Sequence, residues 1–127
     1  MQEHFKLKFR QRDADVDLFF CQHKPPPSKR QNGSRCFTTC TLRVFDDYNL
    51  FVYSGVAIAH PNEENRWSFS EGKRVAFGRM ADNCVAQRIV KHFGNHRALQ
   101  DAEDVRRTRI AMKGDLYRAF FEAGGKF

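Results

Sequence analysis

The sequence predicts an α+β fold, in which an N-terminal antiparallel β-sheet packs against two C-terminal α-helices. Apolar and polar residues alternate with a period of two in several segments of residues 5–60, as in half-buried strands. From residue 69 onward, the apolar residues recur with the 3.6-residue period of a helix. Strands followed by helices, without regular alternation of the two, indicate the α+β class. The 127 residues are enough to bury the core of a single domain, residues 1–127.

Four segments of the first half have the pattern of β-strands. Residues 5–10 (FKLKFR) alternate apolar and basic side chains, and residues 16–23 (VDLFFCQH) form a second apolar segment after a charged turn. Residues 35–45 (RCFTTCTLRVF) and 50–60 (LFVYSGVAIAH) are rich in β-branched and aromatic residues. The short turn DDYN between these last two segments predicts a β-hairpin.

Two local features limit these strands. Residues 24–35 contain three consecutive prolines and an Asn-Gly pair, so we expect a loop there. Gly55, inside the last strand, predicts either a β-bulge or the close approach of another backbone. The side chains that we expect to face the helices are Phe5, Leu7, Phe9, Leu42, Val44, Phe51, Val56 and Ile58.

A capping box opens the first helix. Ser68 is followed three residues later by Glu71, which predicts a helix from about Phe69 to Phe93. At about 100° per residue, one arc of this helix collects aliphatic side chains, and Arg79 falls on the edge of that arc. Phe77 is expected to point the opposite way, among basic residues. The arc comprises Val75, Val85, Ala86, Ile89 and Phe93, together with Asp82, and the basic face comprises Lys73, Arg74, Arg88 and Lys91.

A second helical region is expected at about residues 98–122, with Gly114 as the candidate position for a break. Its apolar face contains Arg109, which repeats the anomaly of Arg79. The final residues, AGGKF, predict a C-cap followed by frayed residues. The apolar face of this helix comprises Val105, Met112, Leu116, Ala119 and Phe120.

Arg79 and Arg109 each need a partner, because a guanidinium group that is turned towards a core without one carries a large energetic penalty. One explanation is an internal ion pair. For Arg79 the partner would be Asp82. For Arg109 it would be Asp101, Asp104 or an acid of the sheet. The other explanation, of equal weight, is a shared recess in which both arginines bind phosphate groups.

The chain is strongly basic, since 22 Lys and Arg outnumber 15 Asp and Glu and give a net charge of +7 and a pI near 9.5. This balance favours an anionic partner, either nucleic acid or a phosphate-bearing nucleotide ligand, and argues against a DNA mimic, which has to be acidic. A soluble basic domain without such a partner is the alternative. The sequence shows no apolar run that could span a bilayer and no signal-peptide pattern. We therefore expect a cytoplasmic protein without a membrane partner.

The sequence favours neither a metal site nor an enzyme. Its four cysteines form no CxxC pair, and Cys36 and Cys40 lie on one face of a strand, where we interpret them as reduced core residues. His92 and His96 have helical spacing, but a Gly-Asn pair is expected to end the helix between them. His60 is the best candidate for a general base, yet no nucleophile lies at a recognisable spacing from it. We expect no metal, no cofactor and no catalysis.

The candidate ligand-binding residues surround the anomalous arginines. Trp67 and Phe77 are the aromatic residues expected to be exposed and to stack on a base, although Phe77 fits a dimer interface equally well. Asn83 could read a base edge, and the basic residues would bind phosphates. The complete set is Trp67, Arg74, Phe77, Arg79, Asn83, Arg106, Arg109 and Lys113.

Residues 53–80 (YSGVAIAHPNEENRWSFSEGKRVAFGRM) resemble a pattern in small phage-encoded proteins, in which a strand ending in G-V-A-x-x-H-P precedes an acidic loop and a segment F-S-x-x-x-G-R-x-x-A-x-x-R-A. With its size, N-terminal sheet and two C-terminal helices, the chain is similar to the phage Thoeris anti-defence proteins. Those proteins sequester cyclic ADP-ribose-type immune signals, and some bind cyclic oligonucleotides. The residues that carry the resemblance, in similar order, are Gly55, Val56, Ala57, His60, Pro61, Phe69, Ser70, Gly72, Arg74, Ala76 and Arg79.

The resemblance implies a non-catalytic, homo-oligomeric phage protein that sequesters an anionic, nucleotide-derived signal in the host cytoplasm and thereby counteracts anti-phage defence. Arginines and stacking aromatic residues would supply the affinity without any acid–base groups. The alternative is a basic inhibitor that binds nucleic acid or a host protein, such as an anti-CRISPR. A small hydrolase is a distant third interpretation.

Overall fold

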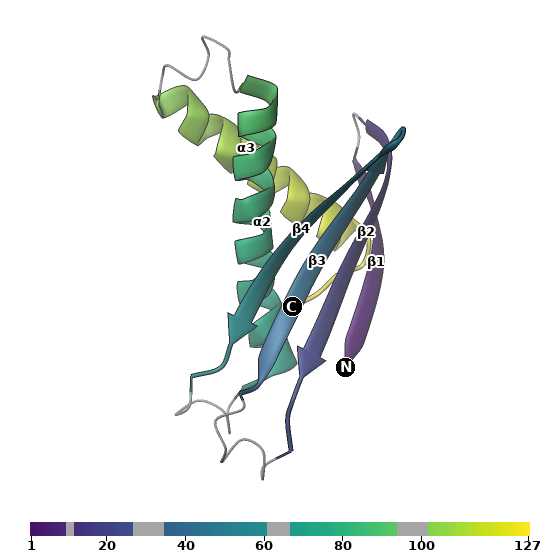
Figure 1. Ribbon diagram of the computed structural model, residues 1–127, viewed down its shortest axis with the longest axis vertical. Helices are drawn as coiled ribbons and strands as arrows, with labels where there is room; N and C mark the ends of the chain where they lie inside the picture. Colours follow the sequence, from purple (N-terminus) through teal and green to yellow (C-terminus); the bar gives the residue numbers. More distant parts are fainter. Residues whose placement is uncertain (10–11, 27–34, 61–66, 94–101) are drawn as a thin grey trace.

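Four β-strands form a single antiparallel sheet, in which every strand pairs with its neighbour in the sequence (Figure 1). The strands are β1 (Gln2–Phe9), β2 (Arg12–His23), β3 (Phe37–Asp46) and β4 (Asn49–Ile58), in the order β1-β2-β3-β4. The helices α2 (Phe69–Phe93) and α3 (Ala102–Glu122) lie on one side of this sheet. The computed structural model describes residues 1–9, 12–26, 35–60, 67–93 and 102–127. The predicted α+β class is confirmed.

The alternation of side chains gives the sheet a covered face, which packs on the helices, and an open face. Leu7, Leu42 and Val44 were predicted to be in the core, and all three are buried on the covered face. The pairing of β2 with β3 and of β3 with β4 runs without a shift in register. Directly paired residues of these strands therefore lie on the same face of the sheet along their whole length. The covered face also includes the buried residues Val16, Leu18, Phe20, Cys40, Tyr53 and Ala57, with Phe5, Phe9 and Phe51 partly buried beside them.

Beyond Gly55, β4 faces the helices with the opposite set of side chains from the one predicted. Val56 and Ile58 are 40% and 57% exposed, so their predicted place in the core is wrong. No bulge interrupts the pairing of β4 with β3, whereas the predicted close approach is confirmed. A Cβ atom at Gly55 would overlap the backbone of α2 at Ala76 and Met80. Small residues of β4 face α2 because the helix lies too close to the strand for larger ones.

The first helix, α2, begins at the predicted cap, where the N–H of Glu71 donates a hydrogen bond of 3.1 Å to the Oγ of Ser68. Its rotation about its own axis differs from the prediction. Phe77 is completely buried and Val75 is 38% exposed, so the predicted orientations of both residues are wrong. Burying the large ring of Phe77 removes more apolar surface from water than burying Val75. The buried arc comprises Ala76, Phe77, Met80, Ala81, Cys84 and Val85.

Phe77 lies at the centre of an aromatic cluster that joins both helices to the C-terminus. Its ring centroid lies 4.7 Å from that of Tyr117, 5.2 Å from that of Phe120 and 5.5 Å from that of Phe127. Phe127 is partly buried against the core, so the predicted fraying of the last residues is wrong. The aromatic ring of the final residue anchors the tail.

The second helix, α3, is continuous from Ala102 to Glu122, so the candidate break at Gly114 is not present. The helix ends in a Schellman motif, which confirms the predicted C-cap. Gly124 has a φ of 89°, and its N–H donates to the carbonyl oxygen of Phe121, while the N–H of Gly125 donates to that of Phe120. The predicted start of this helix at residue 98 lies outside the described residues, as does most of the proline-rich loop.

Candidate functional site

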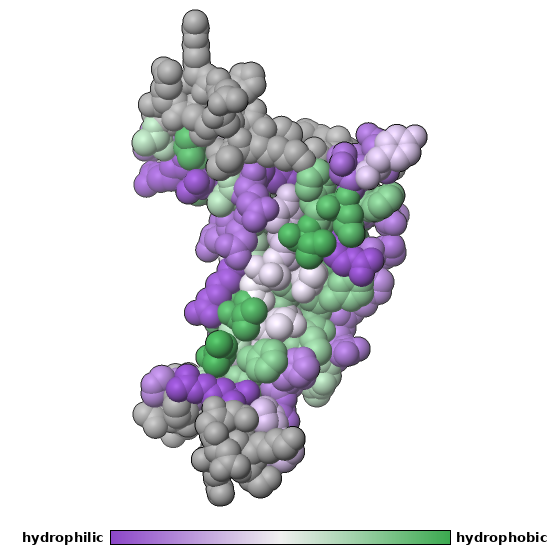
Figure 2. All heavy atoms as spheres, in the orientation of Figure 1, coloured by the Kyte–Doolittle hydropathy of each residue, from purple (hydrophilic) through white to green (hydrophobic). Residues whose placement is uncertain are grey.

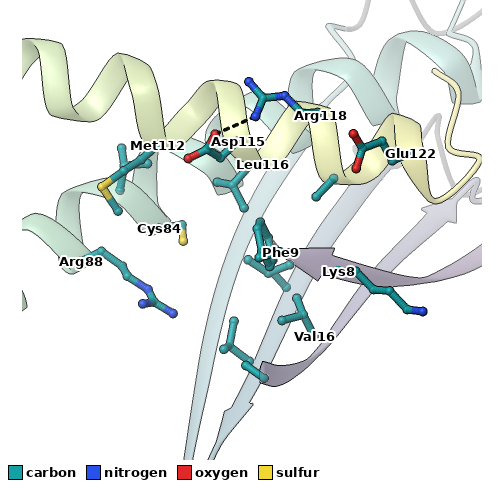
Figure 3. Close-up of a pocket in the computed structure, with 15 residues that line it drawn as sticks. Lys8, Phe9, Val16, Cys84, Arg88, Met112, Asp115, Leu116, Arg118 and Glu122 are labelled. Atoms are coloured by element: carbon teal, nitrogen blue, oxygen red, sulfur yellow. Dashed lines mark hydrogen bonds and ion pairs between the residues drawn. The ribbon is translucent and has the colours of Figure 1, made fainter. Parts of the chain in front are cut away.

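A cavity of about 530 Å³ lies between the covered face of the sheet and the two helices (Figure 3). In the described part of the chain, the backbone of α3 comes close to α2 and β1 but not to β2 or β3. The ring of Phe120 still reaches that of Phe20 on β2, at 5.6 Å, and the gap lies beside this contact. Small side chains of the helices, such as Cys84 of α2 and Ala119 of α3, face this gap and leave part of it unfilled. The apolar lining consists of Phe9, Ala14, Val16, Leu42 and Val44 from the sheet, Cys84 and Val85 from α2, and Met112, Leu116 and Ala119 from α3.

Charged side chains stand around the mouth of the cavity. Arg88 extends from α2 towards the cavity, whereas the Nζ of Lys8 points away from it (Figure 3). Asp115 and Arg118 of α3 form an ion pair of 3.3 Å with each other. Arg88 is half-buried, and no hydrogen bond or ion pair to another residue of the described ranges holds its guanidinium group. A guanidinium group in this place can bind an anion.

The cavity combines an apolar interior with a guanidinium group at its mouth. Small-molecule sites are commonly apolar cavities of about 300–1,000 Å³ with a few polar groups that fix the orientation of the ligand. A guanidinium group binds a carboxylate or a phosphate through two parallel hydrogen bonds. The arrangement suits a ligand with an apolar or aromatic body and one anionic group.

Arg79 and Asn83, two residues of the predicted site, bind the backbone of β4. The Nη1 of Arg79 donates a hydrogen bond of 2.6 Å to the carbonyl oxygen of Val56, and the Nδ2 of Asn83 donates one of 2.7 Å to that of Ser54. β4 is the edge strand of the sheet next to α2, so these carbonyl groups lie on its unpaired side. The two side chains cover part of the sheet edge.

Asp82, the proposed internal partner of Arg79, instead binds Lys113 of α3 at 2.7 Å. Arg79 is exposed and lines a shallow recess beside β4 together with Asp82 and Asn83. Arg109 is also exposed, but it lines neither this recess nor the large cavity. The described residues therefore do not bring the two arginines together.

The remaining predicted site residues are scattered. Arg74 is exposed on α2, and Arg106 is exposed on α3, where it pairs with Glu103 at 3.4 Å. Trp67 is half-buried against the core, and its Nε1 is buried without a hydrogen-bond partner among the described residues. Phe77 is fully buried, so the prediction that it is exposed for stacking is wrong.

Lys73, which was placed on the basic solvent face of the first helix, is buried, and that prediction is also wrong. Its Nζ lies 2.8 Å from the Oε1 of Glu3 and donates a hydrogen bond of 2.7 Å to the carbonyl oxygen of Lys126. The same ammonium group lies 4.9 Å from the ring centre of Phe69. A buried ammonium group is tolerated here because an acid, a carbonyl oxygen and an aromatic ring replace its water shell.

The cysteines and histidines of the described residues do not form a metal site, since no group of three potential ligands occurs among them. Cys36 and Cys40 are both buried and free, which confirms their predicted place on one face, and burial raises the pKa of the Cys40 thiol. His96 and the side chain of His92 lie outside what the structure describes. Among the described helices, none has a stretch apolar and long enough to cross a membrane.

Sequence reasoning placed Arg88 on a general basic face and did not select it as a site residue. The available signal was its spacing of four residues from Cys84 and three from Val85, which puts these side chains on one side of a helix. That spacing does not reveal a cavity, because the cavity depends on where α3 crosses the sheet. Comparison with protein-family models, curated proteins and solved structures finds no match to this chain.

Proposed function

We propose that the protein is a non-catalytic binding protein for an anionic, nucleotide-sized ligand, and that the ligand occupies the cavity between the sheet and the helices. The observation that carries this proposal is the half-buried Arg88 at the mouth of an apolar cavity of about 530 Å³. The ring system of the ligand would lie among Val16, Val44 and Leu116, and its anionic group would bind Arg88.

Sequestration needs affinity alone, and the composition of the cavity supports that reading. The acids that line it, Asp115 and Glu122, lie on α3 at the mouth, and Asp115 is already paired with Arg118. A charge-assisted hydrogen bond contributes on the order of 1.5–3 kcal/mol. Burial of a ring contributes further through the hydrophobic effect. Together these terms suffice for binding without a chemical step.

The biological part of the proposal comes from the sequence. The resemblance of residues 53–80 to the Thoeris anti-defence proteins supports a cyclic ADP-ribose-type or cyclic oligonucleotide signal as the ligand, and sequestration of that signal in the host cytoplasm as the function. The ligand would then bind at Arg88, and not between Arg79 and Arg109 as the sequence suggested.

The test is calorimetric titration of the purified protein with cyclic ADP-ribose, a cyclic dinucleotide and adenosine monophosphate. We expect Arg88→Ala to weaken binding of the ligand roughly tenfold to a hundredfold, at 1.4 kcal/mol per factor of ten. Arg88→Lys should not restore it, because an ammonium group cannot form the paired hydrogen bonds. Arg74→Ala, which removes an exposed arginine from the same helix, is the matched control.

A second measurement reports on the place of binding. Cys84 lines the cavity, so a bound ligand should slow its alkylation, while the partly exposed Cys21 on the open face of the sheet should react as before. Binding that leaves the reactivity of Cys84 unchanged, or that survives in Arg88→Ala, would contradict the proposed site. Absence of binding by every nucleotide tested would contradict the ligand class.

Nucleic-acid binding is the second candidate function, and the first half of α3 favours it. Arg106, Arg107 and Arg109 are exposed on one side of this helix, around Ile110, which is 63% exposed. Such a surface can follow a phosphate backbone, and its affinity should fall steeply with salt. Electrophoretic mobility shifts at two salt concentrations distinguish the candidates, since Arg107→Ala with Arg109→Ala should abolish this binding and Arg88→Ala should not.

A further inference from the structure

The open face of the sheet carries an apolar surface that the helices leave uncovered. Leu50, Val52, Val56 and Ile58 of β4 are between 40% and 57% exposed, and Phe45 of β3 is 52% exposed. Figure 2 shows these hydrophobic side chains gathered in two groups on the viewer's side of the sheet, with nearly neutral residues between them. Large exposed apolar patches of this kind mark interaction sites.

The arrangement of this surface is close to symmetric about Ser54. Leu50 and Val52 precede Ser54 on the open face, and Val56 and Ile58 follow it at the same spacing. The directly opposite residues of β3 match this pattern at its ends and centre, with an aromatic residue at each end and a threonine in the middle, whereas the exposed Arg43 stands opposite Val52 and Thr39 opposite Val56. The cross-strand pairs are Leu50 with Phe45, Ser54 with Thr41, and Ile58 with Phe37.

We propose that this face is the interface of a homodimer, in which a two-fold axis passes near Ser54. A two-fold axis makes the same patch meet itself, so a self-complementary surface is required. Rotation about an axis near Ser54 places Leu50 and Val52 of one copy over Val56 and Ile58 of the other. The small polar pair Ser54 and Thr41 then lies at the crossing point of the two sheets, which pack about 10 Å apart.

The free edge of the sheet beside this face offers a poorer route to association. Pairing of β4 with the β4 of a second copy would need its unpaired carbonyl groups, but Arg79 and Asn83 already bind those of Val56 and Ser54. Packing of the open faces leaves both hydrogen bonds intact. The structure therefore favours contact through the face over extension of the sheet at β4.

The distribution of charge favours a second copy as the occupant. With a net charge of +7, two chains that met through the arginine-rich surface of α3 would repel each other. On the open face, Lys6 is paired with Asp15 and Asp17 at 3.0 Å each, and His4 lies 2.7 Å from Asp17. This charged half needs no partner, and it can remain hydrated at the rim while the apolar half is covered.

The dimensions of the apolar half indicate a small interface. Ten residues of β4 span roughly 33 Å, and the two strands β3 and β4 are together about 10 Å wide. The resulting flat area of roughly 330 Å² is less than half of the 800 Å² per partner that standard interfaces bury, so we expect a weak dimer.

Sedimentation of the full chain over a range of micromolar concentrations tests the proposal, with dimers as the expected result. Val52→Thr combined with Val56→Thr and Ile58→Thr keeps β-branched side chains on the strand and removes apolar surface. We expect this variant to raise the dimer dissociation constant by roughly a hundredfold or more. Ile110→Thr, at an exposed position on α3, is the control and should leave the constant unchanged.

A crosslinking arm decides the question even where the threonine variant is poorly folded. A residue near a two-fold axis meets its own copy, so Ser54→Cys in a Cys21→Ser background should give covalent dimers with a short bismaleimide. Ile110→Cys in the same background should not. A parent chain that sediments as a single copy overturns the proposal. Dimers that form equally well in the threonine variant, or that crosslink through Ile110 and not through Ser54, also overturn it.

Discussion

Replacing Gly55 by alanine places a methyl group where α2 already lies. The added Cβ would overlap the carbonyl oxygen of Ala76 and the backbone nitrogen of Met80, well inside the 3.0 Å that real Cβ contacts respect. Both atoms belong to a helical backbone, so the whole helix has to recede by at least about half an ångström. A shift of this kind also stretches the hydrogen bonds by which Arg79 and Asn83 hold β4.

The expected loss follows from three contributions. Overpacking typically costs about 1–3 kcal/mol, and each weakened hydrogen bond up to about 1 kcal/mol. Alanine also lowers the backbone entropy of the unfolded chain, which offsets about 0.4–1 kcal/mol of the loss in unfolding free energy. Gly55→Ala should therefore lower the free energy of unfolding by about 1–4 kcal/mol, measured by urea denaturation monitored with circular dichroism.

Gly114→Ala is the matched control. Gly114 lies in the interior of α3, where a Cβ meets nothing within 4 Å, so the same substitution should stabilise the protein by about 0.5–1 kcal/mol. The two glycine variants should thus shift stability in opposite directions. A Gly55→Ala protein that is as stable as the parent would refute the close packing of α2 on β4.

Three further outcomes test the packing and the charges. Phe77→Ala should lose about 3–5 kcal/mol of unfolding free energy, and Phe121→Ala, at a 52% exposed position, less than about 1 kcal/mol; equal losses would contradict the buried arc of α2. Lys73→Met keeps most of the apolar stem but removes the two polar contacts of the ammonium group, and it should lower the unfolding free energy by about 1–3 kcal/mol in the same denaturation assay. Burial would raise the pKa of Asp17, but hydrogen bonds with His4 and a lysine of β1 outweigh burial and hold it below 3.8. The stability that this carboxylate contributes is present above pH 3.8 and is lost as the pH falls through the lowered pKa, so the difference in melting temperature between the parent and Asp17→Asn should close in that acidic range. A difference that persists there would contradict the assignment.

Local patterns determined those features that depend on neighbours in the sequence. The cap of α2 needs only the hydroxyl of Ser68 and the N–H of Glu71 three residues later, and the end of α3 needs a residue such as Gly124 that tolerates a positive φ. Alternation on β1 and β3 correctly placed Leu7 and Leu42 in the core, because polar or small residues occupy the other face near them. The α+β class follows from these periods.

Alternation alone did not determine which face of β4 is covered, because apolar residues occupy both faces. Val56 and Ile58 are larger than Ala57 and would gain more from burial, yet Ala57 is buried and they are exposed. The contact with α2 decided this, since the helix backbone comes so close at Gly55 that only small side chains fit between them. The rotation of α2, with Phe77 inward, follows from the same contact and from the aromatic rings of α3.

The candidate sites likewise required the tertiary structure. Arg79 has the sequence context of an arginine facing the core, but its guanidinium group reaches past the helix to a carbonyl group of the strand edge. The place of Arg88 at the mouth of a cavity depends on the gap between α3 and the sheet. The sequence alone determined the periods of the elements, the cap of α2 and the end of α3, because hydrogen bonds and side-chain contacts within a few residues set them. The predicted charged turn at residues 12–15 is wrong, since β2 already begins at Arg12. Only the packed structure decided which faces meet, because that choice depends on the volumes of side chains distant in the sequence.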